Sequence, residues 1–224
     1  MGVSGDLIWS GQRNMHLPKL VDKLIPSGPS ARAFLEDASH RRIDARLGLK
    51  ELFLFLIVRK LRPARVIETG VRVGWTTRAL LSAMDANDRG KLVSIDLPTL
   101  GEGRLNADGA WDTAHVDRES DTGREVPEYL RSRWELRLGD ARALLPAALS
   151  EAPIDMFFHD SDHSKSHMTW ELGQAWSALR PGGILVADDT ELHDGFATFC
   201  SSVGRTASPL VFGFGPRAMG AVRK

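Results

Sequence analysis

Three aspartates stand directly after two apolar runs of the sequence. Asp160 follows the run 154–159, and Asp188 and Asp189 follow the run 184–187. If these runs are neighbouring strands, the three carboxylates meet and repel one another unless a cation joins them. Oxygen ligands favour Mg²⁺ or Mn²⁺ over zinc. We therefore predict a divalent metal site, the alternative being that Asp188 or Asp189 caps a following helix.

A histidine is placed to act as a base beside this site. His163 lies three residues after Asp160, and a hydroxyl held by a metal needs a proton acceptor close by. An unperturbed histidine, with a pKa of ~6.5, is largely neutral at pH 7 and accepts that proton. Lys165 is the competing base, although its pKa of ~10.4 would have to fall. We expect His159 to pack inside the strand and His167 to lie at the surface.

An earlier strand candidate ends in a glycine-containing turn. Residues 68–77 read ETGVRVGWTT, in which Gly70 and Gly74 permit a tight turn and close approach of a ligand. Thr76 adds a hydroxyl where the next helix begins. The G-x-x-x-G spacing differs from the G-x-G-x-x-G of dinucleotide binders. Glu68 would repel a pyrophosphate and would suit a cationic ligand.

Two further acids stand at the ends of the next runs. Asp96 ends the run 92–96, where a carboxylate commonly accepts hydrogen bonds from both ribose hydroxyls. Asp140, followed by Ala141, comes after the run 134–138 and is placed to accept a hydrogen bond from an adenine amino group. A ribose, an adenine, a positive charge and no phosphate together describe S-adenosylmethionine.

Strand and helix patterns alternate from residue 65 onward. Strand candidates are 65–68, 92–96, 134–138, 154–159, 184–187, 210–214 and 219–223, and helix candidates are 75–86, 141–149, 165–179 and 193–203. This alternation indicates βαβ units and a parallel sheet covered on both faces. The last two runs are too close together for a parallel connection, so they form an antiparallel hairpin. We predict a Rossmann-like, doubly wound α/β fold whose mostly parallel, seven-stranded sheet ends in that hairpin.

Length and composition fit one globular domain. The chain has 224 residues, of which 42% are hydrophobic and 26% charged, and these values exclude disordered and fibrous proteins. We expect a single domain over 1–224, with a helical N-terminal cap over 1–62 and an α/β core over 63–224. Residues 98–126 are rich in charge and show little periodicity, so we predict a lid over the site. The alternative is a solvated surface loop.

Charge and cysteine content exclude several classes of partner. Basic and acidic residues number 29 each, so nothing points to a nucleic acid. The lone Cys200 excludes zinc or iron–sulfur sites made of several thiolates. The longest apolar run, 52–58, is too short to cross a membrane. We expect a cytoplasmic protein, and the apolar segment 45–58 is compatible with a helix-mediated homodimer.

Five motifs in order make the sequence similar to the class I S-adenosylmethionine-dependent methyltransferases. They read VIETGVRVGWTT, LVSIDLP, LGDARALLP, IDMFFHDSDH and PGGILVADDT, and the resemblance covers residues 65–224. More narrowly, the chain resembles small-molecule O-methyltransferases of the catechol, caffeoyl-CoA and macrolide-sugar types. The resemblance implies a cofactor pocket lined by Glu68, Gly70, Gly74, Thr76, Asp96, Asp140 and Ala141.

The same resemblance bears on the chemistry. Metal-dependent members carry acids or an amide at the positions of the three aspartates, and the macrolide-sugar type carries a histidine at the position of His163, where the catechol type has lysine. It implies methylation of a hydroxyl on a small molecule such as a phenol, sugar or natural product, with S-adenosylmethionine and Mg²⁺ or Mn²⁺.

Three alternatives remain. A nicotinamide-dependent oxidoreductase is disfavoured by Glu68 and by the glycine spacing. A metal-dependent hydroxylase or hydrolase would use the same acids. A non-catalytic ligand-binding protein is disfavoured because the acids are intact.

Overall fold

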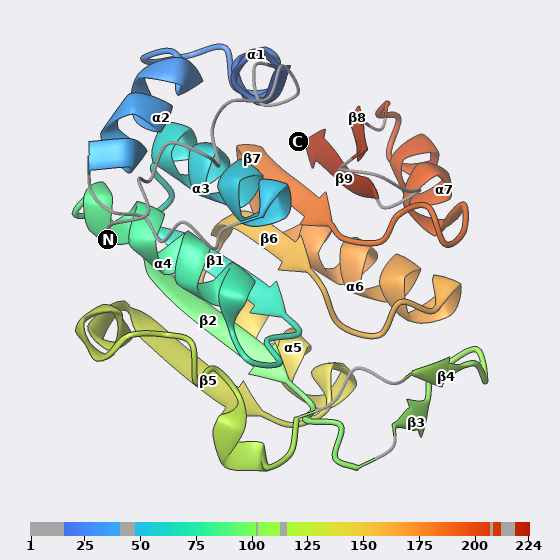
Figure 1. Cartoon of the computed structure of the whole chain (residues 1–224). Coiled ribbons are helices and arrows are strands. Elements are labelled where there is room, and N and C mark those ends of the chain that lie inside the picture. Colours follow the sequence, from blue (N-terminus) through green and yellow to red (C-terminus); the bar gives the residue numbers. More distant parts are fainter. Residues whose placement is uncertain (1–15, 41–47, 102, 113–115, 207, 212–217) are drawn as a thin grey trace.

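A computed structural model describes residues 16–40, 48–101, 103–112, 116–206, 208–211 and 218–224. Figure 1 shows one central sheet with helices on both faces. The helices are α1 (His16–Leu24), α2 (Ala31–His40), α3 (Leu49–Leu61), α4 (Trp75–Ala86), α5 (Ala141–Glu151), α6 (Lys165–Ala178) and α7 (Gly195–Ser202). Helices α3 and α4 cover one face, with α1 and α2 packed on α3, and α5 to α7 cover the other.

The central sheet has seven strands in the order β5-β2-β1-β6-β7-β9-β8. They are β1 (Arg65–Thr69), β2 (Lys91–Asp96), β5 (Trp134–Leu138), β6 (Ile154–His159), β7 (Leu179–Ala187), β8 (Ser208–Val211) and β9 (Ala218–Arg223). The first five strands in this order are parallel, and β9 is antiparallel to both of its neighbours. The predicted mostly parallel sheet with a C-terminal antiparallel hairpin is therefore confirmed.

The predicted strand ends differ from the observed ones mainly near the C-terminus. Strand β7 begins at Leu179, five residues before the predicted strand 184–187, and includes the residues PGG at 181–183. Gly182 takes up a left-handed backbone conformation there, with φ of 82°, so the strand passes through an irregular stretch before pairing regularly. The predicted strand 210–214 lies partly outside the described residues.

The strand register brings the predicted site residues together. Thr69 at the end of β1 pairs with His159 at the end of β6, and His159 pairs with Ala187 at the end of β7. The residues that follow, including Asp160 and Asp188, therefore leave the sheet side by side. Strand order reverses direction between β1 and β6, and ligands bind at such a switch point in doubly wound sheets.

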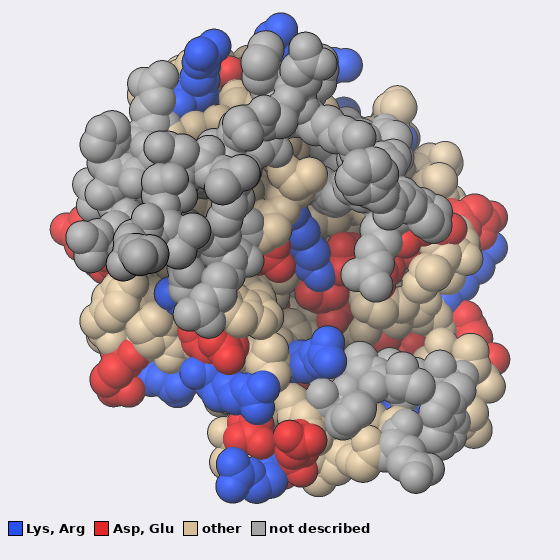
Figure 2. Space-filling model, in the orientation of Figure 1, with Lys and Arg blue, Asp and Glu red and all other residues tan. Residues whose placement is uncertain are grey.

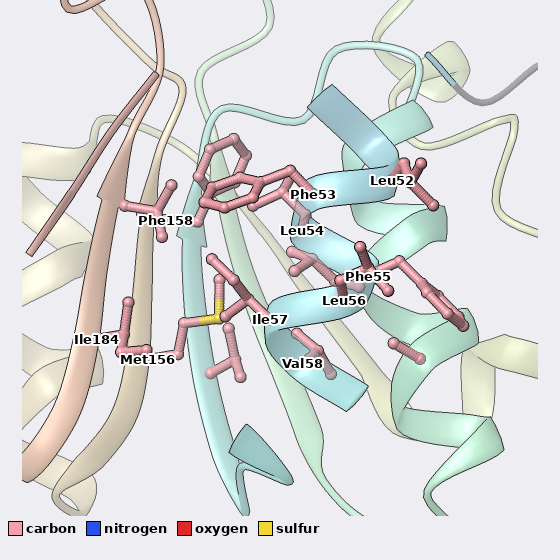
Figure 3. Packing of buried hydrophobic residues seen from close by; sticks show 14 of the residues in the cluster. Leu52, Phe53, Leu54, Phe55, Leu56, Ile57, Val58, Met156, Phe158 and Ile184 are labelled. Carbon is pink, nitrogen blue, oxygen red and sulfur yellow. The ribbon is translucent and has the colours of Figure 1, made fainter. Parts of the chain in front are cut away.

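Helix α3 is buried on nearly all sides. Figure 3 shows its apolar side chains packed against residues of the sheet, among them Met156, Phe158 and Ile184. All seven residues from 52 to 58 are at most 3% exposed, because α1, α2 and α4 cover the sides that the sheet does not. The apolar side chains in the described part of the segment 45–58 are thus buried within the chain. Their apolar character does not support the predicted helix-mediated dimer.

The N-terminal helices are fastened to this buried helix. Lys60 near the end of α3 places Nζ 2.5 Å from Asp22 Oδ1 of α1 and donates a second hydrogen bond to the carbonyl of Pro29. Residues 1–15 and 41–47 of the predicted cap lie outside the described residues. Within the described part of the chain, no helix is long and apolar enough to span a membrane.

Candidate active site

A cavity of about 1100 Å³ opens at the carboxyl ends of the parallel strands. Its wall follows the strand order, from Asp140 after β5 and Asp96 at the end of β2 to Gly70 after β1, Asp160 after β6 and Asp188 after β7. Figure 2 shows acidic side chains gathered in a hollow at the centre of this face, with basic side chains beside them. Most of the predicted cofactor residues and most of the predicted chemical residues therefore border one space.

The first glycine of the turn after β1 is required by close packing. Gly70 has φ of +84°, and a Cβ there would lie 1.9 Å from the carbonyl oxygen of Asp160. No other residue fits without moving the backbone of β1 or β6. Gly74, with φ of +94°, precedes α4 and lies outside the cavity lining, so its role is to shape the turn.

Glu68 lies beneath the turn rather than in the cavity, which corrects the expectation that it contacts a cationic ligand. Its fully buried carboxylate accepts hydrogen bonds from Thr76 Oγ1 (3.1 Å), Thr77 Oγ1 (2.8 Å) and Ser94 Oγ (2.7 Å). Burial raises the pKa of Glu68 to about 7, although the three hydroxyls oppose the shift. Thr76 borders the cavity, but its hydroxyl is engaged by Glu68. Glu68 therefore ties β1, β2 and α4 together below the ligand space.

Asp96 lies in the cavity wall with one oxygen fixed and one available. Its Oδ1 accepts backbone hydrogen bonds from Val71 (2.7 Å) and Arg72 (3.2 Å), which orient the carboxylate against the glycine turn. The other oxygen has no protein partner among the described residues. Asp140 caps α5 through Oδ1, and both it and Ala141 border the cavity. These positions agree with those predicted for a nucleoside.

A lysine that sequence reasoning missed joins the aspartates after β6 and β7. Lys50, in the first turn of α3, places Nζ 2.9 Å from Asp160 Oδ2 and in direct contact with Asp188 Oδ2. Burial lowers the pKa of Lys50, but the two carboxylates outweigh burial and hold that pKa above its usual value. Lys50 stands 110 residues before Asp160, and nothing in its local sequence indicates this pairing.

The same ion pair separates the pKa values of the two aspartates. Burial raises the pKa of Asp160 well above its usual range, with Lys50 opposing and Asp188 adding to the shift. The pKa of Asp188 is lowered in spite of burial, because the ammonium of Lys50 contacts it directly. Asp189 also borders the cavity and has a left-handed backbone, with φ of 49°.

His163 lies in the cavity wall near the aspartates, as predicted. Its Nε2 is 3.7 Å from Asp160 Oδ1 and 3.6 Å from Asp189 Oδ2, so both carboxylates are close without being hydrogen-bonded to it. Burial, followed by the neighbouring His159, lowers the pKa of His163 to about 4. Its Nδ1 is buried without a partner among the described residues. At neutral pH the ring is an uncharged base with unused hydrogen-bonding capacity.

A buried carboxylate supports the strand from which these residues leave. Glu171 of α6 lies 2.7 Å from His159 Nδ1 and 2.9 Å from His167 Nε2, and it accepts hydrogen bonds from Thr69 (2.6 Å) and Ser161 (3.0 Å). The hydrogen bonds and charges of His159 and His167 hold the pKa of Glu171 well below its usual value despite its burial. His159 is packed inside, as expected, whereas His167 is buried and not at the surface.

Lys165 lies away from the site in which it was predicted to act as the competing base. It begins α6, and its Nζ lies 2.6 Å from Asp194 Oδ1, in a pair whose side chains are 49% and 67% exposed. Lys165 does not border the cavity that contains His163. This position gives no support to Lys165 as the competing base.

The segment predicted as a lid contributes to the cavity wall. It contains a short hairpin of β3 (Arg104–Leu105) and β4 (Trp111–Asp112), so it is not the structureless loop that its sequence suggests. The hairpin tip docks on α6, because Asp108 accepts hydrogen bonds from the backbone of Lys165 (2.7 Å) and the hydroxyl of Ser166 (2.7 Å). The residues of the hairpin arm that border the cavity are Arg104, Leu105, Asn106 and Ala107.

The carboxylate cluster in this arrangement does not fit a divalent cation. The Lys50 ammonium lies on Asp160 and Asp188, where such an ion would bind. Within the described residues, no group of three or more His, Cys, Asp or Glu side chains is arranged to hold a metal. The predicted Mg²⁺ or Mn²⁺ site therefore lacks support in this geometry, since Lys50 already relieves the repulsion on which the prediction rested.

A family model described as a methyltransferase domain matches residues 67–190, a span that runs from β1 to the aspartates after β7. The chain belongs to this methyltransferase family. Among curated proteins, none matches the chain significantly.

Solved structures of methyltransferases share the fold. An O-methyltransferase from Bacillus cereus in complex with SAH is 19% identical, with 93% of this chain and 97% of that chain covered and a TM-score of 0.58. The O-methyltransferase TomG from Streptomyces achromogenes, involved in tomaymycin synthesis and solved in complex with SAM, is 21% identical, with 97% and 92% covered and a TM-score of 0.58. A putative O-methyltransferase from Klebsiella pneumoniae is 21% identical, with 92% and 94% covered and a TM-score of 0.57. The whole described fold, including the N-terminal helices, is thus that of these methyltransferases.

Proposed function

We propose that this methyltransferase transfers the methyl group of S-adenosylmethionine to a hydroxyl oxygen of a small molecule. The observation that carries the proposal is that one cavity contains both the available oxygen of Asp96 and the neutral imidazole of His163. Its volume, about 1100 Å³, lies slightly above the usual range for small-molecule sites and leaves room for a second ligand beside the cofactor.

The cofactor side of the cavity fits a nucleoside without phosphate. S-adenosylmethionine, when bound, supplies a methyl group that a nucleophile displaces from a positively charged sulfur. The free oxygen of Asp96 is placed for the ribose hydroxyls, and Asp140 with Ala141 borders the space beyond it for the adenine. Gly70 keeps the floor between these groups and the aspartates free of side-chain atoms. Because S-adenosylmethionine has no pyrophosphate, the site needs no helix N-terminus or lysine to bind one.

The chemical side of the cavity is built to remove a proton. His163 is neutral at pH 7 and takes the proton of the substrate hydroxyl, which makes that oxygen a stronger nucleophile. Asp160 and Asp189, each within 4 Å of Nε2, stabilise the positive charge that the ring acquires. The wall formed by the hairpin limits the access of water.

The substrate side also presents apolar surface. Leu97 and Leu105 border the cavity and are 42% and 63% exposed, values that are high for side chains of this kind. A substrate with an apolar part, such as a phenol or a hydroxylated natural product, would cover them. The exposed leucines therefore favour an acceptor that carries an apolar group beside its hydroxyl.

Titration calorimetry with S-adenosylmethionine tests the cofactor half of the proposal. The parent should bind it, and Asp96→Ala should bind at least ten times more weakly, because a charged acceptor of two hydroxyls is lost. Asp85→Ala, which removes a carboxylate of α4 outside the cavity lining, is the matched control and should bind as the parent does. Equal binding by Asp96→Ala, or binding of NADH in place of S-adenosylmethionine, would contradict the assignment.

Transfer of a labelled methyl group tests the acceptor half. The parent is incubated with labelled S-adenosylmethionine and a panel of catechols, sugars and polyketide glycosides, and products are identified by mass spectrometry. We expect label on a hydroxyl oxygen of at least one member that carries an apolar group. Label found only on nitrogen or carbon acceptors would overturn the assignment of O-methylation while leaving the cofactor assignment intact.

A further inference from the structure

The ammonium of Lys50 occupies the centre of the carboxylate cluster. It contacts one oxygen of Asp160 and one of Asp188, the residues that follow two adjacent strands. Its side chain is 27% exposed and borders the cavity, and the ring of Phe158 lies 5.9 Å from Nζ on the inner side. A cation is therefore already present at the position where the strand ends bring the acids together.

The position of this ammonium is set by the hydrophobic core. Lys50 lies in the first turn of α3, two residues before the run 52–58 that is buried between the sheet and the other N-terminal helices. Because these side chains pack on strands β6 and β7, the helix cannot slide along the sheet without opening the core. The core thus delivers a fixed positive charge to the ends of the same two strands.

We propose that Lys50 takes the place of a divalent metal ion in this enzyme, as a built-in cation that joins Asp160 to Asp188 and leaves the site closed to Mg²⁺ and Mn²⁺. An ion bound to both carboxylates would lie within a few ångströms of the ammonium, and two positive charges that close repel strongly in a partly buried site. Removing one partner of such a pair leaves uncompensated charge, so the lysine and the two aspartates depend on one another.

Lys50 also has a hydrogen-bond donor left for the substrate, an inference that rests on the function proposed above. An ammonium has three N–H donors, and the two carboxylates engage two of them. The third has no protein partner among the described residues and belongs to a side chain that borders the cavity. It is available to a substrate oxygen, which it would hold beside His163 while that residue takes the proton.

Binding of Mn²⁺, followed by electron paramagnetic resonance of the free ion, tests the replacement without any methyl transfer. We expect no Mn²⁺ site in the parent at micromolar to millimolar ion. Lys50→Met keeps most of the length of the side chain and removes the ammonium, so it should acquire a Mn²⁺ site at least ten times tighter than any site in the parent. Lys23→Met, at an exposed position of α1, is the matched control and should remain like the parent.

Two results would overturn the proposal. One is a Mn²⁺ site in the parent that is lost in Asp188→Asn, since Lys50 would then have to yield to an ion. The other is a folded Lys50→Met that binds no Mn²⁺, since the lysine would then not be what closes the site. Neither result depends on the identity of the substrate or on binding of S-adenosylmethionine.

A second measurement covers the case in which Lys50→Met fails to fold. The ¹⁵Nζ signal of Lys50 is assigned in the parent by its loss in Lys50→Arg, and Mn²⁺ is then added to the parent. The signal should keep its width, because no ion binds within the cluster. Selective broadening of this signal at low Mn²⁺ would place an ion beside Nζ and refute the proposal.

Discussion

His163 and Glu68 show that burial determines what each titratable residue contributes. Both are enclosed, and burial shifts the pKa of each toward the neutral form, downward for the histidine and upward for the glutamate. The neutral histidine borders the cavity and is available to a substrate, whereas the glutamate is enclosed by hydroxyl groups and supports the backbone. The sequence identifies both as polar groups near strand ends, but the direction in which each side chain points depends on the tertiary structure.

Replacing His163 with alanine should lower turnover by roughly 10²–10⁴-fold, the usual contribution of a general base. The parent rate should rise with pH only up to about the pKa of 4 and remain flat at neutral pH, because the neutral ring is already present there. Initial rates of methyl transfer between pH 4 and 9 check both statements. Lys165→Ala should retain parental turnover. If the rate instead rises with pH around ~6.5, the unperturbed pKa of a histidine, the result would contradict burial of the base.

The pKa of Glu68 predicts a pH dependence of stability. Its folded-state pKa of about 7 lies above the 4.5 of an unperturbed glutamate, so the folded state retains a proton that the unfolded state releases between these pH values. The free energy of unfolding should therefore fall as pH rises from about 4.5 to 7, by about 3 kcal/mol at most. Glu68→Gln should remove this contribution, since the hydroxyls around it also accept hydrogen bonds.

Urea denaturation at a series of pH values measures the effect. Glu135→Gln on β5, which removes a carboxylate that is 58% exposed, is the matched control and should keep the parental pH dependence. If Glu68→Gln follows the same curve as the parent, Glu68 is ionised throughout and its hydroxyl partners outweigh burial.

At the scale of elements, the strand ends were predictable and the contribution of α3 was not. Asp96, Asp160 and Asp188 each follow an apolar run, and parallel strands in register must bring such residues to one edge. Lys50 belongs to a helix from another part of the chain, and its pairing follows from how that helix packs. For the same reason the sequence indicated a metal where the structure has an ammonium.

The hairpin of β3 and β4 should act as a latch on α6. Asp108→Ala removes two of the hydrogen bonds that hold the hairpin tip, so limited proteolysis should cut within 98–126 faster than in the parent. Asp117→Ala, at an exposed position of the same segment, should leave the rate unchanged. Binding of S-adenosylmethionine with an acceptor should slow cleavage in the parent. Equal cleavage of all three proteins would indicate a surface loop with no part in closure.

At the scale of the whole molecule, the N-terminal helices and the sheet share one core. Their shared cluster extends from Leu17 in α1 through α3 to Met156 in β6 and Met219 in β9. Composition and length indicated a single domain, but only the packing shows that the N-terminal part is structural support for the site. Lys50 can be held against Asp160 and Asp188 only if this core is intact.

Truncating one side chain of this core should therefore weaken both the fold and the site. Phe55 of α3 is fully buried, so Phe55→Ala should lower the free energy of unfolding by about 3–5 kcal/mol. Tyr129→Ala, at a position 68% exposed, is the aromatic control and should change stability by less than about 0.5 kcal/mol.

Hydrogen exchange at increasing urea concentration shows whether the N-terminal helices and the sheet share one core or have separate cores. Amides of α3 and of β1 and β6 should lose protection at the same urea concentration, earlier in Phe55→Ala than in the parent. Loss of protection in α3 alone, with the sheet unchanged, would mean that the helix is an added layer and that the sheet holds the aspartates in place without it.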